Sequence, residues 1–259
     1  MKGLSLLDFL QIRDYFQEVF NGRTAWLTPI IHFKVFGVKP VLFFLLRIPA
    51  LRKMFLSVDW RTRERIIENN LLYCFLDKLH ERSQILDIGY AESTVSLELA
   101  SMGYKVTGID MRDFPMTHPN FSSVIGNICQ MPFKDESFDL IISISTIEHI
   151  GISSYGMTAF PEGDAKAIKE ILRCLKPNGL FYLTVPFGGT QTTAWQRIYN
   201  SQSLNSLLRD FEILVSKYYR RYQYKFWLPA TAEELEKVPS TVEEGVNGVA
   251  IKLCSPRSK

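Results

Sequence analysis

Three residues that could bind a nucleotide-like cofactor follow two short apolar segments of the chain. Asp87 and Gly89 stand at the end of the first segment, and Asp110 ends the second, roughly 20 residues later. This is the interval expected between a cofactor-binding turn and an acid that accepts hydrogen bonds from ribose hydroxyls. An aspartate solvated in a turn at the end of a strand would leave the same pattern. The spacing therefore predicts a cofactor site and leaves this second interpretation of Asp110 open.

The loop after Gly89 favours one class of cofactor over another. The pyrophosphate of a dinucleotide approaches the backbone at the start of a helix and needs several glycines, whereas Gly89 is followed by Tyr90, Ala91 and Glu92. Glu92 would also repel a pyrophosphate. S-adenosyl-L-methionine carries a sulfonium and an amino acid in place of phosphates, so Asp87 or Glu92 near its positive charge would favour binding. The loop predicts S-adenosyl-L-methionine as cofactor, and methyl transfer rather than hydride transfer.

The residues that could catalyse methyl transfer follow the fourth apolar segment, which continues into Ser145, Thr146, Ile147, Glu148 and His149. Methyl transfer is an in-line displacement at an activated carbon, so the protein has mainly to align a nucleophile and remove its proton. His149 titrates near neutral pH and is the first candidate for the general base, with Glu148 as its orienter or as a second base. Alternatively, His149 packs in the loop and Glu148 caps a backbone N–H.

The elements that must position these residues alternate between short apolar segments and amphipathic ones, which indicates a parallel sheet with crossover helices. We predict strands at residues 84–88, 105–109, 123–126, 140–145, 180–185, 211–219 and 248–254, and helices at residues 66–80, 93–102, 164–175 and 204–208. The fold class is α/β: a Rossmann-like, doubly wound, mostly parallel seven-stranded sheet with an N-terminal helical extension. Ligands of such a sheet bind outside the carboxyl ends of the strands. The helix at 164–175 should stop at Pro177, with Gly179 in the left-handed conformation.

Four blocks within residues 84–187 resemble class I S-adenosylmethionine-dependent methyltransferases in order and spacing. The blocks are residues 86–89, residues 108–110, residues 126–133 with 138–139, and residues 175–180. In that family the position of Asn127 usually holds an aspartate that bonds the adenine amino group, while the next backbone N–H, here that of Ile128, meets the adenine ring. Asn127 can accept one such bond through its side-chain carbonyl, and Ala91 replaces the family's second glycine. The resemblance implies cofactor contacts from Asp87, Gly89, Ala91, Asp110, Asn127, Ile128 and Ser145.

A further set of blocks is similar to one branch of methyltransferase-like proteins. The branch has Ser-x-Ile-Glu-His, Tyr-Gly, Gly-Asp and Arg-x-Tyr blocks, which here are residues 145–149, 155–156, 163–164 and 197–199. The similarity implies a shared architecture on the acceptor side but no particular acceptor. Asp164 could instead cap a helix, and Arg197 and Tyr199 could bind a polar acceptor or pack in their loop.

The same strand end could also hold a metal ion. Some methyltransferases of the ubiquinone pathway and of small-RNA ends carry Glu-x-x-Glu-His there and hold a divalent cation. Ser145 stands in place of the first glutamate. Glu148 and His149 alone rarely make a metal site, so no metal is predicted.

We predict two parts of the chain: residues 1–80 as the N-terminal helical extension and residues 81–259 as the methyltransferase domain. Apolar residues recur at helical spacing within residues 1–20. Residues 26–55 mix aromatic and basic side chains, a composition found both in membrane-surface helices and in buried cores. We expect residues 26–55 to form a lid or cap over the acceptor, with peripheral membrane contact or a dimer surface as the alternatives.

Composition restricts partners and location. The net charge of +3, from 30 basic and 27 acidic residues, gives no overall field that would attract nucleic acid. The four cysteines lie far apart with no Cys-x-x-Cys pair, which favours reduced, buried thiols. The first residues lack the apolar length of a secretory signal. We therefore expect a cytoplasmic protein, at the inner face of the membrane if residues 26–55 bind lipid.

The predicted function is methyl transfer from S-adenosyl-L-methionine to a hydroxyl of a small molecule, such as a sugar or a glycan precursor. One alternative is a non-catalytic binding module that retains the fold. Another is a nucleotide-sugar oxidoreductase or epimerase, although such proteins usually have glycine-rich pyrophosphate loops and a Tyr-x-x-x-Lys pair, which this chain lacks in the required places. The sequence makes no prediction of oligomeric state.

Overall fold

The computed structural model describes residues 63–91, 93–152, 160–189, 191–193, 195–222, 226–237 and 247–257. Met1–Arg61 and Thr62–Lys259 are two separate compact units, and the description below concerns the second. The helix predicted in residues 1–20, the segment 26–55, Glu92 and the Tyr-Gly block at 155–156 lie outside the described residues. The domain boundary at residue 80 and the role of the extension stay predictions. Within the described ranges, none of the helices combines the length and apolar character needed to span a lipid bilayer.

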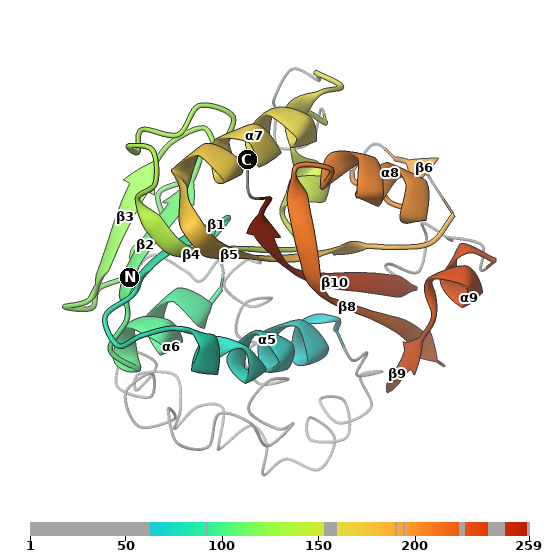
Figure 1. The fold of residues 1–259 in the computed structure, drawn as a ribbon, viewed down its shortest axis with the longest axis horizontal. Helices are drawn as coiled ribbons and strands as arrows, with labels where there is room; N and C mark the ends of the chain where they lie inside the picture. The colour runs from blue at the N-terminus through green and yellow to red at the C-terminus, as the bar shows by residue number, and fades with distance from the viewer. Residues whose placement is uncertain are drawn as a thin grey trace, which may run out of the picture. The chain divides into compact units, whose positions relative to one another are not determined.

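The described residues form a mixed sheet of eight strands in the order β3-β2-β1-β4-β5-β10-β8-β9 (Figure 1). The first five strands in this order are parallel. β10 is antiparallel to β5 and β8, and β9 is antiparallel to β8. The strands are β1 (Gln84–Ile88), β2 (Lys105–Asp110), β3 (Phe121–Ile125), β4 (Phe138–Ile144), β5 (Leu175–Pro186), β8 (Phe211–Tyr222), β9 (Phe226–Ala230) and β10 (Gly248–Pro256), beside a small ribbon of β6 (Gln191–Thr192) and β7 (Arg197–Ile198).

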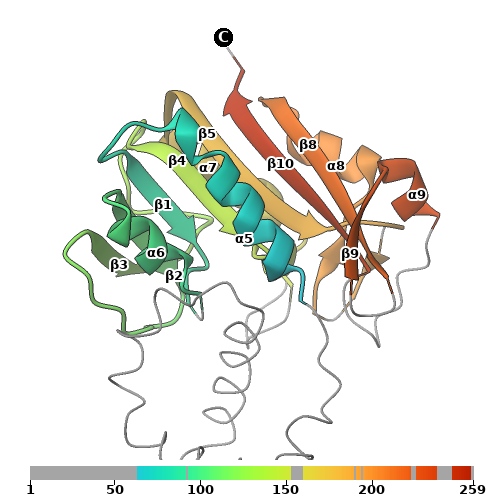
Figure 2. The ribbon, with the colours of Figure 1, turned by 90° about the horizontal axis from the view of Figure 1, so that it is seen from below.

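Helices cover both faces of this sheet (Figures 1 and 2). One face carries α5 (Arg65–Cys74), the 3-10 helix η1 (Leu76–Lys78) and α6 (Val95–Ser101), and the other carries α7 (Gly163–Cys174) and α8 (Ser201–Leu207). The 3-10 helix η2 (Ile147–His149) follows β4, and α9 (Ala232–Glu236) follows β9. Because both faces are covered, β4 and β5 are almost continuous runs of buried apolar residues.

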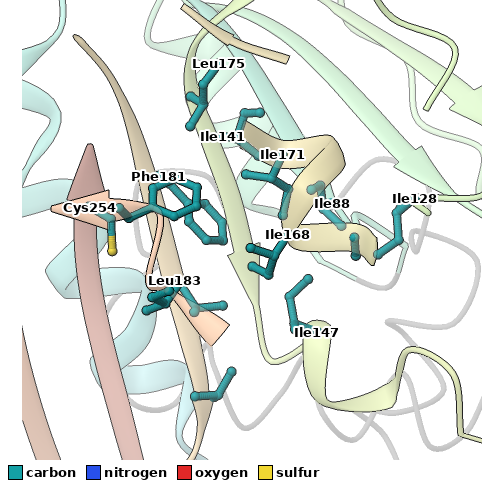
Figure 3. Close-up of a cluster of buried hydrophobic side chains, with 14 of the residues drawn as sticks. Ile88, Ile128, Ile141, Ile147, Ile168, Ile171, Leu175, Phe181, Leu183 and Cys254 are labelled. Atoms are coloured by element: carbon teal, nitrogen blue, oxygen red, sulfur yellow. The ribbon is translucent and has the colours of Figure 1, made fainter. Parts of the chain in front are cut away.

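Two hydrophobic clusters hold these layers together, one on each face of the sheet. Under α7 and α8, Ile168 and Ile171 pack against Ile141 and Phe181 of the sheet (Figure 3). On the opposite face, Leu72 of α5 belongs to a second cluster. Full burial of such a side chain contributes about 1.5–3 kcal/mol, so the apolar stripes of the two helices fix their orientation.

The structure confirms the fold class, and it contains all seven predicted strands and all four predicted helices of the described unit. β9 is an additional edge strand, which the sequence pattern hides because Pro229 interrupts it. The prediction for Gly179 was wrong: Asn178 adopts the left-handed conformation (φ 64°), which asparagine tolerates. The prediction of four buried cysteines was also wrong, since Cys74 is exposed and Cys129 is half-buried.

Candidate cofactor and active site

The carboxyl ends of β1, β2 and β4 lie within one residue of the same level, because β1 pairs in parallel register with both neighbours. The Gly89 N–H donates to the Ile109 carbonyl over 2.9 Å. Likewise, the Gly126 N–H donates to the Asp110 carbonyl over 2.9 Å. The predicted cofactor contacts therefore line one edge of the sheet in the order Asn127, Asp110, Gly89 and Ser145.

The turn after β1 has a conformation that requires glycine. Gly89 has φ 75°, in the left-handed region that L-residues rarely adopt. A Cβ atom at this position would lie 2.5 Å from Oγ1 of Thr146, in the loop after β4. Thr146 Oγ1 in turn lies 3.2 Å from the carbonyl oxygen of Ile88, to which it donates. The turns after β1 and β4 are thus fitted to each other through the absence of a side chain at residue 89.

Tyr90 follows Gly89 in the loop that lacks further glycines, and its side chain points into the protein. Its ring is fully buried, packs against Phe121 with 5.6 Å between ring centroids, and covers Gly108, where a Cβ would lie 2.5 Å from the Tyr90 Cγ atom. The Tyr90 hydroxyl donates to the Phe114 carbonyl over 3.3 Å. Tyr90 therefore anchors the cofactor turn to β2 and β3. Ala91 beside it is also buried.

Asp87 is a buried carboxylate at the end of β1. Its Oδ2 accepts a 2.7 Å hydrogen bond from the Ser96 hydroxyl of α6. Burial raises the Asp87 pKa from 3.8 to about 7; the negative charge of Asp110 adds to the rise, and the Ser96 hydrogen bond and Arg65 oppose it. A group with such a pKa can change its charge when a cation arrives beside it.

Asp110 is held by the residue two positions further along the chain. Its Oδ1 accepts a 2.9 Å hydrogen bond from the Arg112 backbone N–H, and the Arg112 Nε atom lies 3.3 Å from the same oxygen. The structure thus supports part of the turn interpretation, because Oδ1 closes a local turn. A carboxylate has two acceptor oxygens, so this arrangement is compatible with ribose binding through Oδ2.

Asn127 and Ile128 follow β3 with different environments. The Asn127 Oδ1 atom accepts a 2.9 Å hydrogen bond from the Cys129 backbone N–H, which leaves the second lone pair of a carbonyl oxygen for an adenine amino group. The Ile128 side chain is buried in the cluster beneath α7. Only its backbone would meet the cofactor, as the family resemblance implies.

Ser145 adopts an unusual backbone conformation at the end of β4. Its φ is 46°, a strained value for a residue other than glycine. Its hydroxyl donates to Glu68 Oε1 over 2.8 Å, and its N–H donates to the Thr184 carbonyl over 3.2 Å. Because the hydroxyl is directed to Glu68, we expect any cofactor contact of Ser145 to come from its backbone.

Glu68 of α5 is the site residue that the sequence analysis missed. Its side chain is fully buried, and its Oε1 also accepts a 2.7 Å hydrogen bond from the Thr184 hydroxyl. Arg65 lies 3.9 Å from its Oε2 atom. Burial raises the Glu68 pKa, while Arg65 opposes this. The sequence did contain one indication that Glu68 is buried: it stands four residues before Leu72, inside the apolar stripe of its helix.

Glu148 and His149, the predicted orienter and general base, lie in η2 after β4. Glu148 is buried, and its Oε1 atom lies 3.9 Å from His149 Nε2. The Glu148 pKa is raised well above 4.5, chiefly by burial and further by Glu68. The His149 Nδ1 atom lies 2.7 Å from the Trp195 carbonyl oxygen, to which it donates. Burial lowers the His149 pKa from 6.5, so the neutral imidazole, with its lone pair on Nε2, predominates at neutral pH.

Asp164, Arg197 and Tyr199 form a linked group beside η2. The Tyr199 hydroxyl donates to Asp164 Oδ2 over 2.9 Å, and Arg197 Nε lies 3.6 Å from the same oxygen. Arg197 also donates to the Pro161 carbonyl over 3.1 Å. The group therefore ties α7 to the loop after β5, which supports the packing interpretation. Asp164 is not the helix cap, because α7 begins one residue earlier.

A metal centre has no built ligand set in the described part of the chain: no group of three or more His, Cys, Asp and Glu side chains is placed to hold an ion there. Glu148 and His149 remain a pair, with Ser145 bound to Glu68.

Comparison with known proteins identifies the domain type. Residues 86–183 match the family model described as "Methyltransferase domain". The chain is 31% identical over 124 residues to a sterol 4-C-methyltransferase of Caenorhabditis elegans, covering 42% of this chain and 34% of that protein. It is 30% identical over 109 residues to demethylmenaquinone methyltransferase of Chlorobaculum tepidum, covering 40% of each. The chain thus spans well under half the length of these curated relatives.

Solved structures extend the likeness of fold beyond that segment. One example is the crystal structure of 1,6-didemethyltoxoflavin-N1-methyltransferase of Burkholderia thailandensis, with bound 1,6-didemethyltoxoflavin and S-adenosylhomocysteine. The likeness covers 84% of this chain and 89% of the chain in that structure. Its TM-score is 0.55 at 14% sequence identity. This likeness concerns the fold alone and extends it over most of the described unit.

Proposed function

This chain carries a class I S-adenosylmethionine-dependent methyltransferase domain, and we propose that it binds S-adenosyl-L-methionine along the sheet edge and methylates a small molecule. One observation carries the proposal. Asn127, Asp110 and Gly89 come from three separate strand ends at the carboxyl edge of the sheet, where the Gly126 N–H donates to the Asp110 carbonyl and the Gly89 N–H donates to the carbonyl of Ile109, the residue before Asp110.

The residues of this row fit the proposed cofactor. Asp110 offers acceptors for ribose hydroxyls, and Asn127 offers one for the adenine amino group. Asp87, whose pKa lies at about 7, would be held ionised by a neighbouring positive charge and would stabilise that charge in return. S-adenosyl-L-methionine supplies a methyl group activated by a positively charged sulfur. A dinucleotide fits less well, because Tyr90 and Ala91 replace the glycines that a pyrophosphate needs.

We propose His149 as the base that takes the proton of the acceptor. Its Nδ1 proton is donated to the Trp195 carbonyl, a bond that selects the tautomer with the lone pair on Nε2. Because burial lowers its pKa, His149 is in the basic form at neutral pH. Glu148 Oε1 lies 3.9 Å from Nε2; because burial raises the pKa of Glu148, it would stabilise the imidazolium only in its ionised form, which the positive charge on His149 would favour.

The acceptor that we propose is a hydroxyl of a small molecule, with a sugar or glycan precursor as one class. The base supports an oxygen nucleophile, since a hydroxyl must lose its proton during transfer. The relatives support a small molecule, because their names specify a sterol, demethylmenaquinone and 1,6-didemethyltoxoflavin. They do not favour a saccharide over other hydroxyl compounds, so a screen should include both sugars and lipophilic alcohols.

Calorimetric titration with S-adenosyl-L-methionine and S-adenosylhomocysteine tests the cofactor site. Asp110→Ala should weaken binding by roughly 100-fold, because it removes charge-assisted hydrogen bonds. The matched control Asp113→Ala, at an exposed position nearby, should bind as the wild type does. Absence of binding in the wild type, or equal affinities for wild type and Asp110→Ala, would refute the site.

Methyl transfer itself is tested by incubating the protein with cofactor labelled in the methyl group and a cell extract, followed by identification of the labelled product. Label in a small molecule, lost in His149→Gln, is the expected result. Cofactor binding without any transfer, together with tight binding of a protein partner, would instead indicate the binding module.

A further inference from the structure

The β8–β9 hairpin ends in an exposed apolar surface. Antiparallel pairing places Arg220 opposite Leu228 and Tyr222 opposite Phe226, and directly paired residues point to the same face of a sheet. Tyr222, Phe226 and Leu228 are 50%, 55% and 50% exposed. Arg220 is also exposed. These four residues, which we call the hairpin patch, lie on the edge of the sheet farthest from β3.

The inner part of the same face is covered, so the patch is confined to the end of the hairpin. One pair further in, Tyr218 opposite Ala230 packs against the core, with the Tyr218 and Phe187 ring centroids 4.8 Å apart. Lys252, itself buried, donates to the Tyr218 hydroxyl over 2.7 Å. The face thus changes within two residues from packed core to exposed apolar surface.

β8 is basic where it carries the patch. The sequence has no acidic residue between Glu212 and Glu233, whereas Lys217, Arg220 and Arg221 all lie in β8. Lys217 and Arg221 are on the opposite face of the strand, and Arg221 stands between Arg220 and Tyr222 in the chain.

Of the three carboxylates of the neighbouring helix α9, one pairs with a lysine, and the other two accept hydrogen bonds from backbone N–H groups, which carry no charge. Glu233 pairs with Lys237 over 2.6 Å. Glu234 accepts from the Thr231 N–H over 2.8 Å, and Glu236 accepts from the Ser201 N–H over 2.7 Å.

The size and the edge of the patch argue against a protein partner. Three half-exposed side chains offer about 300 Å², well below the about 800 Å² that each partner buries in a stable protein complex. Pro229 stands in the outer strand and has no N–H to donate, which disfavours addition of another strand. A lipid surface needs neither large area nor strand pairing, because aromatic and aliphatic tips enter the interface while basic side chains contact anionic headgroups.

We propose that the hairpin patch docks the protein on an anionic lipid surface. Val249 of β10 pairs with both Pro186 of β5 and Tyr219 of β8, so the patch extends beyond the carboxyl end of β5, at the same edge as the cofactor row (Figure 2). Docking through the patch brings this edge to the lipid surface. Delivery of a lipophilic acceptor there rests on the proposed function, whereas docking itself does not.

Sedimentation of the full chain with vesicles tests the proposal. The wild type should bind vesicles of phosphatidylcholine with phosphatidylglycerol, bind phosphatidylcholine alone far more weakly, and be released by salt. Phe226→Ser combined with Leu228→Ser should weaken binding about tenfold or more. Arg220→Glu should weaken it more than fivefold, since each basic residue near the surface contributes about a fivefold factor.

Matched controls use exposed residues away from the patch. Met102→Ser, directly after α6, and Lys169→Glu, on α7, should leave vesicle binding unchanged, and all variants should keep the wild-type affinity for S-adenosyl-L-methionine. The cofactor measurement separates failure of docking from failure of the proposed function. The proposal is overturned if the wild type does not bind anionic vesicles or if the patch is needed for a dimer in solution. It is also overturned if the patch variants bind vesicles as the wild type does, which is the result that a membrane contact through residues 26–55 would produce.

Discussion

Replacing Asp87 by asparagine should make the stability of the protein less dependent on pH. The Asp87 pKa is about 7 in the folded chain, against 3.8 for the ordinary residue. A carboxyl with a raised folded pKa contributes stability that is fully present below the unfolded value and is lost as pH rises through the folded value. The rise corresponds to about 4 kcal/mol, lost by the wild type between about pH 4 and pH 8.

Asp87→Asn keeps the neutral form of the side chain at every pH. The amide oxygen can still accept from the Ser96 hydroxyl, so the variant should resemble the wild type near pH 4. Its free energy of unfolding should exceed that of the wild type by an amount that grows with pH, up to about 4 kcal/mol near pH 8. The variant should also bind S-adenosyl-L-methionine more weakly, because it lacks the negative charge that we propose to face the cofactor.

Urea unfolding of the chain without cofactor, at a series of pH values, measures this difference. Subtracting the wild-type curve removes the common contributions of Glu68 and Glu148, whose pKa values are also raised. Asp77→Asn, at an exposed position, is the control and should give a curve parallel to that of the wild type. Parallel curves for Asp87→Asn and wild type would show that the buried carboxylate does not titrate as the structure implies.

Three further predictions concern the same edge of the sheet. His149→Gln should lower kcat about 100-fold or more and leave the cofactor affinity unchanged. The base must be deprotonated, and its pKa is lowered from 6.5. The acid limb of the wild-type kcat/KM profile should therefore lie below pH 6.5, and a limb above that pH would contradict the assignment. Gly89→Ala should cost about 1–3 kcal/mol of stability and weaken cofactor binding, since the φ of residue 89 is 75° and the new Cβ would meet Thr146. If the variant had the thermal unfolding and the cofactor affinity of the wild type, the close fit between the turns after β1 and β4 would be refuted. Glu68→Gln should be tolerated, whereas Glu68→Leu should cost about 2–4 kcal/mol in urea unfolding because two hydroxyls lose their acceptor; equal stability of the two variants would remove the positioning role of Glu68.

The sequence determined those features that depend on local pattern. Short apolar segments predicted the strands of the described unit and apolar residues at helical spacing predicted its helices, because the length and the period of a pattern decide which side chains a single element can bury. The row of proposed cofactor contacts was also accessible, since Gly89, Asp110 and Asn127 each stand at or just after the end of their own strand. The turn at Asn178 was misassigned because both asparagine and glycine adopt the left-handed conformation, and the sequence does not say which one the close packing of the turn selects.

Only the tertiary structure decided how the site is supported. Glu68 contacts Ser145 and Thr184, which lie more than 70 residues away in the chain, and no local pattern encodes such a contact. The raised pKa values of Glu68, Asp87 and Glu148 have the same origin, because burial by distant elements removes the water that would stabilise a charge. At the turn after Gly89, the sequence supplied the glycine and the acid, and the assembled sheet supplied the contact with Thr146 and the buried surroundings that set the charge of Asp87.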